Sequence, residues 1–263
     1  MRLTANGIGM HFTLNGGAGR PLVTLSHSLA THLGMWAPQA AALSARYRVL
    51  RYDTRGHGGT EAPEGPYSLE QLAEDAYQLL RGLGVSRTHF IGLSMGGMIG
   101  QLLALTHPEA VRSLILCDTS SRVPAEARPA WDERIRTVGA RGMESQVEPT
   151  IGRWFTPGFV REHPEAVEPV RSMIRGTPPQ GYIGCGHAIK GLDLTDRLGG
   201  IRVPTLVVVG EDDPGTPVAA ARIIHERIAG SELVILPSAY HLSNLEQAEA
   251  FNAAVLAFLD KVR

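Results

Sequence analysis

A serine with a glycine two residues away on each side stands at the end of an apolar run, in the stretch FIGLSMGGMIGQ (90–101). Because Gly92 and Gly96 have no Cβ, a strand can turn sharply into a helix here and leave Ser94 at the tip of the turn. A serine hydroxyl becomes a nucleophile when a base takes its proton and a carboxylate holds that base in the right tautomer. The pattern predicts a nucleophile if the chain supplies both partners. A glycine-serine turn without chemistry is the alternative.

The candidate bases are the ten histidines of the chain. In enzymes with such a serine, the acid and then the base follow along the chain, in loops after late strands. His241 follows the last strand-like segment, ELVILPSA. A glycine-rich turn accounts for His57, and His107 stands before a proline at a helix end, whereas His187 could line a pocket. Position and order favour His241 as the base.

The acid is expected at the end of the segment TLVVVGED, where two aspartates are adjacent. Asp212 and Asp213 would point in opposite directions from an extended chain. We favour Asp213, three residues after Gly210, because this spacing suits a loop that projects an acid towards a histidine. Asp118, at the end of an earlier strand-like segment, is a third candidate.

Attack on a carbonyl creates an oxyanion, which needs N–H donors that are already in place. The residue after the nucleophile supplies one donor, the backbone N–H of Met95, and the loop after LVTLSHS should supply the second, the backbone N–H of Leu29. His27 and Ser28 stand where such enzymes often have a histidine followed by glycine.

Strand-like and helix-like segments alternate along the chain, which is typical of an α/β fold with a mostly parallel sheet covered on both faces. The alternating segment IGMHFTL predicts an edge strand of a hairpin. Helices are predicted over 35–46, over 68–84, where Ser68 and Gln71 have the spacing of a capping box, and from Met95, directly after Ser94, to His107. Six nearly continuous apolar runs predict buried parallel strands: LVTLSHS, YRVLRYD, THFIGLS, SLILCDT, TLVVVGED and ELVILPSA.

The pattern changes between about residues 122 and 197, where prolines become frequent and β-branched runs vanish. Met143, Val147, Ile151 and Trp154 fall on one helical stripe, which predicts short helices. Ligands bind at the carboxyl edge of such sheets, so we interpret residues 122–197 as a helical lid and residues 1–121 and 198–263 as the core. A decorative insertion is the alternative.

The composition indicates an ordinary globular protein, with 43% hydrophobic and 19% charged residues among 263. A net charge of -1 gives no reason to expect binding to nucleic acid or to an anionic membrane. The two cysteines favour a reducing compartment over a disulfide framework. The N-terminus lacks a signal-peptide pattern and no apolar run reaches membrane-spanning length, so we expect a cytoplasmic protein.

Neither a metal nor another cofactor is expected. The sequence has no His/Cys/Asp cluster at ligand spacing, and the glycines near Ser94 are not followed by the lysine of a phosphate loop. The expected partner is a small-molecule lactone or ester.

With these residues in place, the chain resembles the α/β-hydrolase fold superfamily over nearly its whole length, and within it the 3-oxoadipate enol-lactonases of aromatic-compound degradation. The resemblance implies that Ser94, Asp213 and His241 form a triad that opens 3-oxoadipate enol-lactone to 3-oxoadipate, in the β-ketoadipate pathway. Several similar stretches are lid or loop segments, which vary most between subfamilies. The similar stretches are SLATHLGMWAPQAAALS, YRVLRYDTRGHGGTEAPEGPYSLEQLAED, HFIGLSMGGMIGQ, LILCDTSSR, RWFTP, GYIGCGHAIKGLDL and YHLSNLE.

The substrate that this resemblance implies carries a free carboxylate, for which a bidentate arginine is the preferred partner. Arg134 and Arg153 are candidates, with Lys190 behind them, and a solvated surface charge is the alternative for each. Trp131 and Trp154 either wall the pocket or belong to the lid core.

Two positions near the oxyanion loop depart from the family pattern. His27 stands where asparagine is usual and Ala30 where glycine is usual, and the lid also differs around His187. The exact substrate therefore stays open. A carboxylesterase, a cofactor-free perhydrolase and a hydrolase of carbon–carbon bonds would use the same triad, and some proteins of this fold are ligand receptors.

Overall fold

Eight strands form one sheet in the computed structural model, which describes residues 1–262. Their order across the sheet is β1-β2-β4-β3-β5-β6-β7-β8, and each neighbouring pair from β4 to β8 is parallel. The six predicted parallel strands are thus confirmed. The strands are β1 (Arg2–Ala5), β2 (Ile8–Asn15), β3 (Leu22–Ser26), β4 (Arg48–Tyr52), β5 (Thr88–Leu93), β6 (Val111–Cys117), β7 (Thr205–Gly210) and β8 (Glu232–Leu236).

The two edges of the sheet differ from the sequence-based expectation. β1 and β2 form an antiparallel hairpin through Asn6 and Gly7, which both have the positive φ that a tight hairpin turn requires. β1 occupies the edge, because β2 also pairs with β4. At the opposite edge most of β8 is half-buried rather than buried, since neighbouring elements cover the last strand less completely.

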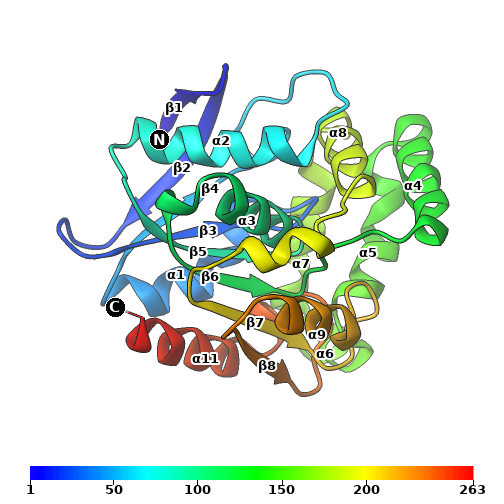
Figure 1. The fold of residues 1–263 in the computed structure, drawn as a ribbon. Helices are drawn as coiled ribbons and strands as arrows, with labels where there is room; N and C mark the ends of the chain where they lie inside the picture. The colour runs from blue at the N-terminus through cyan, green and yellow to red at the C-terminus, as the bar shows by residue number, and fades with distance from the viewer. Residues whose placement is uncertain (263) are drawn as a thin grey trace.

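Helices cover both faces of the sheet, and Figure 1 shows α2 and α3 on one face with α1 and α11 on the other. The predicted helix over 35–46 is a 3-10 turn (Leu33–Trp36) followed by α1. Ser68 caps α2, since its hydroxyl accepts the Gln71 N–H at 3.2 Å. These helices are α1 (Ala37–Ser44), α2 (Leu69–Gly82), α3 (Met95–Thr106), α9 (Val218–Arg227), α10 (Ser243–Glu246) and α11 (Ala248–Lys261). No helix within residues 1–262 has the length and apolar character needed to cross a membrane.

Five helices lie between β6 and β7, and Figure 1 shows α4, α5 and α8 together at one end of the sheet. Prolines that mark this segment in the sequence stand in the first turns of α4, α6, α7 and α8, where the backbone N–H has no partner to lose. The predicted stripe of Met143, Val147, Ile151 and Trp154 is buried. The helices are α4 (Arg128–Arg141), α5 (Val147–Trp154), α6 (Pro157–Glu162), α7 (Pro164–Gly176) and α8 (Pro179–Lys190).

The two ends of this inserted segment meet at its base. The Val123 N–H donates to the Leu192 carbonyl at 3.0 Å, and the Leu194 N–H donates to the Ser121 carbonyl at 2.7 Å. The inserted segment therefore begins and ends at one place, close to the end of β6.

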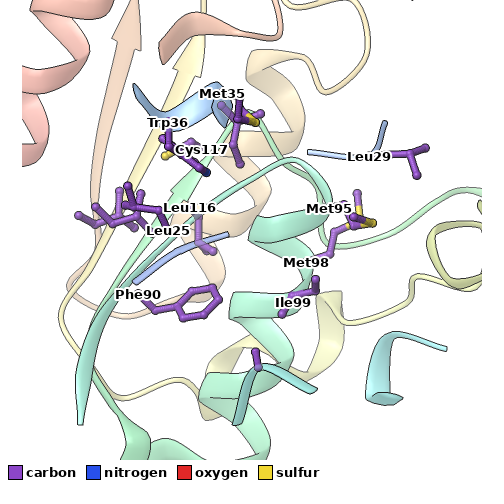
Figure 2. Close-up of a cluster of buried hydrophobic side chains, with 14 of the residues drawn as sticks. Leu25, Leu29, Met35, Trp36, Phe90, Met95, Met98, Ile99, Leu116 and Cys117 are labelled. Atoms are coloured by element: carbon purple, nitrogen blue, oxygen red, sulfur yellow. The ribbon is translucent and has the colours of Figure 1, made fainter. Parts of the chain in front are cut away.

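Helix α3 is buried along most of its length, from Met95 to Ala104. Figure 2 shows side chains of α3 in one cluster with side chains of the central strands. The N-terminus of α3 is therefore held by a packed core, which gives Ser94 a rigid support. The labelled members of this cluster on α3 and the strands are Met95, Met98, Ile99, Leu25, Phe90, Leu116 and Cys117.

Helix α8 approaches the core so closely that side chains would not fit between them. A Cβ on Gly181 would lie 1.9 Å from the Gly56 carbonyl oxygen. We expect Gly181→Ala to lower the free energy of unfolding by about 1–3 kcal/mol through overpacking, which thermal unfolding followed by circular dichroism would measure. Gly152→Ala in α5 is the control, because nothing lies within 4 Å of its added Cβ. Equal stability of the two variants would contradict the contact.

Candidate active site

Ser94 joins β5 to α3 in a strained backbone conformation, with φ 54° and ψ -115°. The two flanking glycines permit this turn for a steric reason. A Cβ on Gly92 would lie 2.1 Å from the Gly96 carbonyl oxygen, and a Cβ on Gly96 would lie 2.1 Å from the Ser26 carbonyl oxygen. The local sequence therefore builds the sharp strand-to-helix turn that it predicts.

The Ser94 side chain lines a cavity of about 570 Å³ at the carboxyl ends of the parallel strands. Its backbone is fixed on both sides, because its N–H donates to the Cys117 carbonyl at 2.9 Å and its carbonyl accepts the Thr119 hydroxyl at 2.7 Å. The residue is 8% exposed, so the hydroxyl is accessible from the cavity and from little else.

The imidazole of His241 is held by Asp213, with His241 Nδ1 at 2.8 Å from Asp213 Oδ2. The Asp213 carboxylate also accepts the Gly215 N–H at 2.7 Å, the Thr216 N–H at 3.0 Å and the Thr216 hydroxyl at 2.6 Å. Because a carboxylate only accepts, Nδ1 carries the proton. The other ring nitrogen, Nε2, is then free to act as a base.

The two groups shift each other's pKa in opposite directions. Burial is the largest single influence and would lower the pKa of His241, but the opposing influences, led by the charge and the hydrogen bond of Asp213, together raise this pKa above 6.5. Burial alone would raise the pKa of Asp213, but the charge of His241 and the hydrogen bonds lower it to about 2. The carboxylate is therefore ionised at neutral pH, where it can stabilise an imidazolium.

Ser94 and His241 line the same cavity, from the loops after β5 and β8. No hydrogen bond joins the Ser94 hydroxyl to His241 within residues 1–262. Such contacts are often long without substrate and tighten when it binds. The arrangement brings a hydroxyl, an imidazole and a carboxylate to one edge of the sheet, as proton transfer from serine to histidine requires.

Of the three candidate acids, only Asp213 contacts His241 through a hydrogen bond. Asp212 is exposed. Asp118 is fully buried, where it accepts the Gly210 N–H at 2.8 Å and the Ser243 hydroxyl at 2.5 Å. Burial, and after it the charge of Asp213, raise the pKa of Asp118 well above 3.8. Asp118 therefore lies beside the catalytic candidates and favours its neutral form.

The two expected oxyanion donors are backbone amides near Ser94. Neither the Leu29 N–H nor the Met95 N–H has an acceptor within residues 1–262. Leu29 lines the cavity, and Met95 is the first residue of α3. Both N–H groups are thus unsatisfied donors near the serine, one on the loop after β3 and the other at the start of α3.

The inserted helices bring four of the six expected substrate contacts to the cavity, namely Trp131, Arg134, Arg153 and Trp154. His187 and Lys190 are not among its lining residues. Ile189 of α8 faces the cavity, and at about 100° per residue His187 and Lys190 turn away from it. Lys190 instead pairs with Asp132 at 2.6 Å, and His187 lines a separate cavity of about 160 Å³.

Three arginines line the cavity, and Arg122 pairs with Asp193 and Asp196. Arg134 and Arg153 have no carboxylate partner within residues 1–262. Arg153 donates to the Thr150 hydroxyl at 3.1 Å, and the Arg134 guanidinium lies 4.9 Å from the centre of the Trp131 ring. Burial, and after it the charge of Arg134, lower the pKa of Arg153. Two like charges without a counter-charge, facing one cavity, are suited to bind an anion.

Sequence reasoning missed a buried carboxylate that ties the insertion to the histidine loop. Glu246 accepts the Thr156 N–H at 2.9 Å and the Tyr240 N–H at 2.8 Å, and the Leu242 N–H donates to the Trp154 carbonyl at 3.1 Å. No sequence pattern signals this contact. Sequence reasoning also missed the hydrogen bonds from Thr216 to Asp213. An aspartate with glycine and threonine two and three residues later is nevertheless a recognisable turn signal.

No group of three or more histidine, cysteine, aspartate or glutamate residues within 1–262 is arranged to hold a metal ion.

Comparison with known proteins agrees with this fold. The model of the alpha/beta hydrolase fold matches residues 21–248. The chain therefore belongs to the α/β-hydrolase fold family, as its sequence predicts.

Within that family, the chain is similar to enol-lactonases over nearly its full length. It is 39% identical to 3-oxoadipate enol-lactonase 2 of Acinetobacter baylyi over 98% of this chain and 96% of that protein. The crystal structure of the enol-lactonase from Burkholderia xenovorans LB400 superposes with a TM-score of 0.96 at 39% identity, covering 99% of this chain and all of that one. A malate-bound thermophilic esterase from Thermogutta terrifontis has a TM-score of 0.94 at 31% identity, covering 100% and 99%. The protein is accordingly a hydrolase.

Proposed function

We propose that the protein opens a carboxylate-bearing enol-lactone, 3-oxoadipate enol-lactone, to 3-oxoadipate through an acyl-enzyme on Ser94. The observation that carries this proposal is the pair of unpartnered arginines in the same cavity as Ser94 and His241. A lactone with a free carboxylate matches this cavity, because its ring can react with Ser94 while its carboxylate binds the arginines. The names of the two similar enol-lactonases and the dicarboxylate bound to the similar esterase support the same class of substrate.

In the first half of the reaction the lactone carbonyl lies against the Leu29 and Met95 N–H groups. His241 takes the proton of the Ser94 hydroxyl, and the serine oxygen bonds to the carbonyl carbon. The backbone donors stabilise the oxyanion that forms. When the oxyanion collapses, the bond to the ring oxygen breaks and the ring oxygen leaves as an enol. The proton on His241 returns to this leaving group, and the enol then becomes a ketone.

In the second half, His241 takes a proton from a water molecule that attacks the acyl carbon. The second oxyanion forms at the same donors, and its collapse breaks the bond to the serine oxygen. The proton on His241 then returns to Ser94. An enolate leaves more easily than an alkoxide, so this hydrolysis is the harder half of the cycle.

Residues 122–197 act as a lid over this site, and residues 1–121 and 198–262 form the core. The support is that α4 and α5 supply Arg134 and Arg153, and that the two ends of the insertion meet at one base beside β6. The lid then selects the substrate and the core performs the chemistry.

Removal of one arginine should affect charged and neutral substrates differently. We expect Arg153→Met to raise KM for the enol-lactone about tenfold to a hundredfold, since a hydrogen bond to a charged group contributes about 1.5–3 kcal/mol. For neutral p-nitrophenyl acetate, kcat/KM should stay within about threefold. Lactone opening is followed by ultraviolet absorbance. Lys190→Met, a lid cation outside the cavity, is the matched control. Equal losses on both substrates would show that Arg153 supports the fold and does not recognise the carboxylate.

A small substrate panel separates the proposal from its alternatives. Fast opening of the enol-lactone, against slow cleavage of p-nitrophenyl acetate and of a ring-cleavage dienoate, is the expected result. A preference for the neutral ester would indicate a carboxylesterase, preference for the dienoate a carbon–carbon bond hydrolase, and peracid formation from acetate and hydrogen peroxide a perhydrolase. No turnover of any of them by folded protein would favour a binding protein.

A further inference from the structure

Two buried histidines lie beneath the loop that carries Leu29, and the proposed reaction does not use either. His27 follows β3, and His57 lies in the loop after the neighbouring strand β4. Both are 0% exposed, and their rings are 5.4 Å apart between centroids. Neither lines the large cavity. A buried imidazole needs hydrogen-bond partners, so their contacts indicate what they do.

The contacts of the two rings are reciprocal. His27, from the β3 loop, accepts the Thr54 N–H of the β4 loop at 2.8 Å through Nε2. His57, from the β4 loop, accepts the Ala30 N–H of the β3 loop at 3.0 Å through Nε2. Each loop therefore donates a backbone N–H to a histidine of the other, and the two strand-end loops are fixed together at two points.

The partners also determine where the ring protons lie. The Nδ1 atoms of His27 and His57 contact carbonyl oxygens, of Ser28 at 2.7 Å and of Arg55 at 3.1 Å, and so donate to them. Each Nε2 faces an N–H and must keep its lone pair. Burial, before other influences, lowers the pKa of His27 to about 4 and that of His57 to about 3, so both rings are neutral at pH 7.

These contacts fix the direction of the Leu29 N–H. The Ser28 carbonyl accepts from His27 Nδ1 and from the Thr31 hydroxyl at 2.8 Å, so it points into the protein. In a planar trans peptide the N–H of the next residue points the opposite way. The Leu29 N–H is therefore directed away from the histidines. Ala30 has φ 59°, a conformation that favours glycine, and its bond to His57 offsets this strain.

We propose that His57 and His27 are positioning residues that hold the loop Ser28–Thr31 so that the Leu29 N–H faces the Ser94 hydroxyl. This inference rests on the proposed function, because it assigns an orienting role within the same site.

The test is the affinity of a transition-state analogue, 6,6,6-trifluoro-5-oxohexanoate, a trifluoromethyl ketone that adds to the serine and places its oxyanion at the donors. In His57→Leu, which removes the acceptor for Ala30, kcat and the affinity for this ketone should fall together by about tenfold to a hundredfold, less than for complete loss of a donor. KM and the affinity for adipate, which uses the arginines and not the donors, should stay within about twofold. His57→Gln, which restores an acceptor, should recover most of the loss, and Ala30→Gly should match the wild type.

Unchanged affinity of folded His57→Leu for the ketone would overturn the inference, while the wild-type rate separately tests the proposed function. The hydrogen bond can also be measured in the wild-type protein, should the variant not fold. A scalar coupling between the Ala30 amide nitrogen and His57 Nε2 in a 15N-labelled sample is expected. Its absence, with the Ala30 amide resonance observed, would equally overturn the inference.

Discussion

Ser94→Ala should lower kcat for lactone opening by on the order of 10⁴-fold or more. The substitution removes the oxygen that forms the acyl-enzyme, and no other group described in the cavity replaces it on the same turn. The free energy of unfolding should change by less than about 1 kcal/mol, because the Ser94 hydroxyl makes no hydrogen bond within residues 1–262 and only one atom is lost. Ultraviolet absorbance measures the rate, and circular dichroism measures the unfolding.

Covalent labelling distinguishes this loss from a general disturbance of the cavity. A fluorophosphonate should label the wild type once, at Ser94, and should not label Ser94→Ala or, at a useful rate, His241→Ala. Ser120→Ala is the matched control, because Ser120 lines the same cavity. It should keep both label and activity. Full activity of Ser94→Ala, or loss of labelling in Ser120→Ala alone, would remove Ser94 from the proposed mechanism.

Much of this site could be predicted from the sequence because its residues follow strands that the apolar pattern reveals. The carboxyl ends of β5, β7 and β8 meet at one edge of a parallel sheet, so Ser94, Asp213 and His241 were expected to converge there. The turn that directs Asp213 towards His241 could not be derived from periodicity. It depends on the Gly215 and Thr216 N–H groups, which bond to the carboxylate only once the loop is closed.

The inserted segment was less predictable, since a helical stripe says which residues share a face but not what that face meets. Trp131 and Arg134 of α4 reach the cavity, whereas His187 and Lys190 of α8 turn away from it because Ile189 occupies the facing position. Which residues reach the cavity depends on the orientation of each short helix, and this orientation follows from its packing against the other helices.

The role of His57 was missed for a related reason. A glycine-rich turn explains this histidine locally, and nothing in the sequence near it indicates Ala30. The two residues meet because β3 and β4 are neighbours in the sheet, which brings their loops together. Contacts of this kind between distant segments are set by strand order, and a single sequence shows strand order only through the fold that it resembles.

Asp213→Asn should lower kcat by on the order of 10⁴-fold, because an amide in place of the carboxylate can donate to His241 Nδ1 and hold the ring in the wrong tautomer. The protein should still fold, since an amide oxygen can accept from the Gly215 and Thr216 N–H groups. The loss should not depend on substrate charge, so kcat for the enol-lactone and for p-nitrophenyl acetate should fall together. Steady-state kinetics on both substrates measures it.

The matched comparison is Asp118→Asn, which makes the same chemical change in the second buried acid. Asp118 already favours its neutral form, and asparagine can accept the Gly210 N–H and donate to the Ser243 hydroxyl in the same geometry. Asparagine also tolerates the positive φ of 42° at this position. We therefore expect kcat to stay within about threefold of the wild type. Equal losses in the two variants would mean that both carboxyl groups act on His241, and a loss in Asp118→Asn alone would transfer the role of acid from the β7 loop to the end of β6.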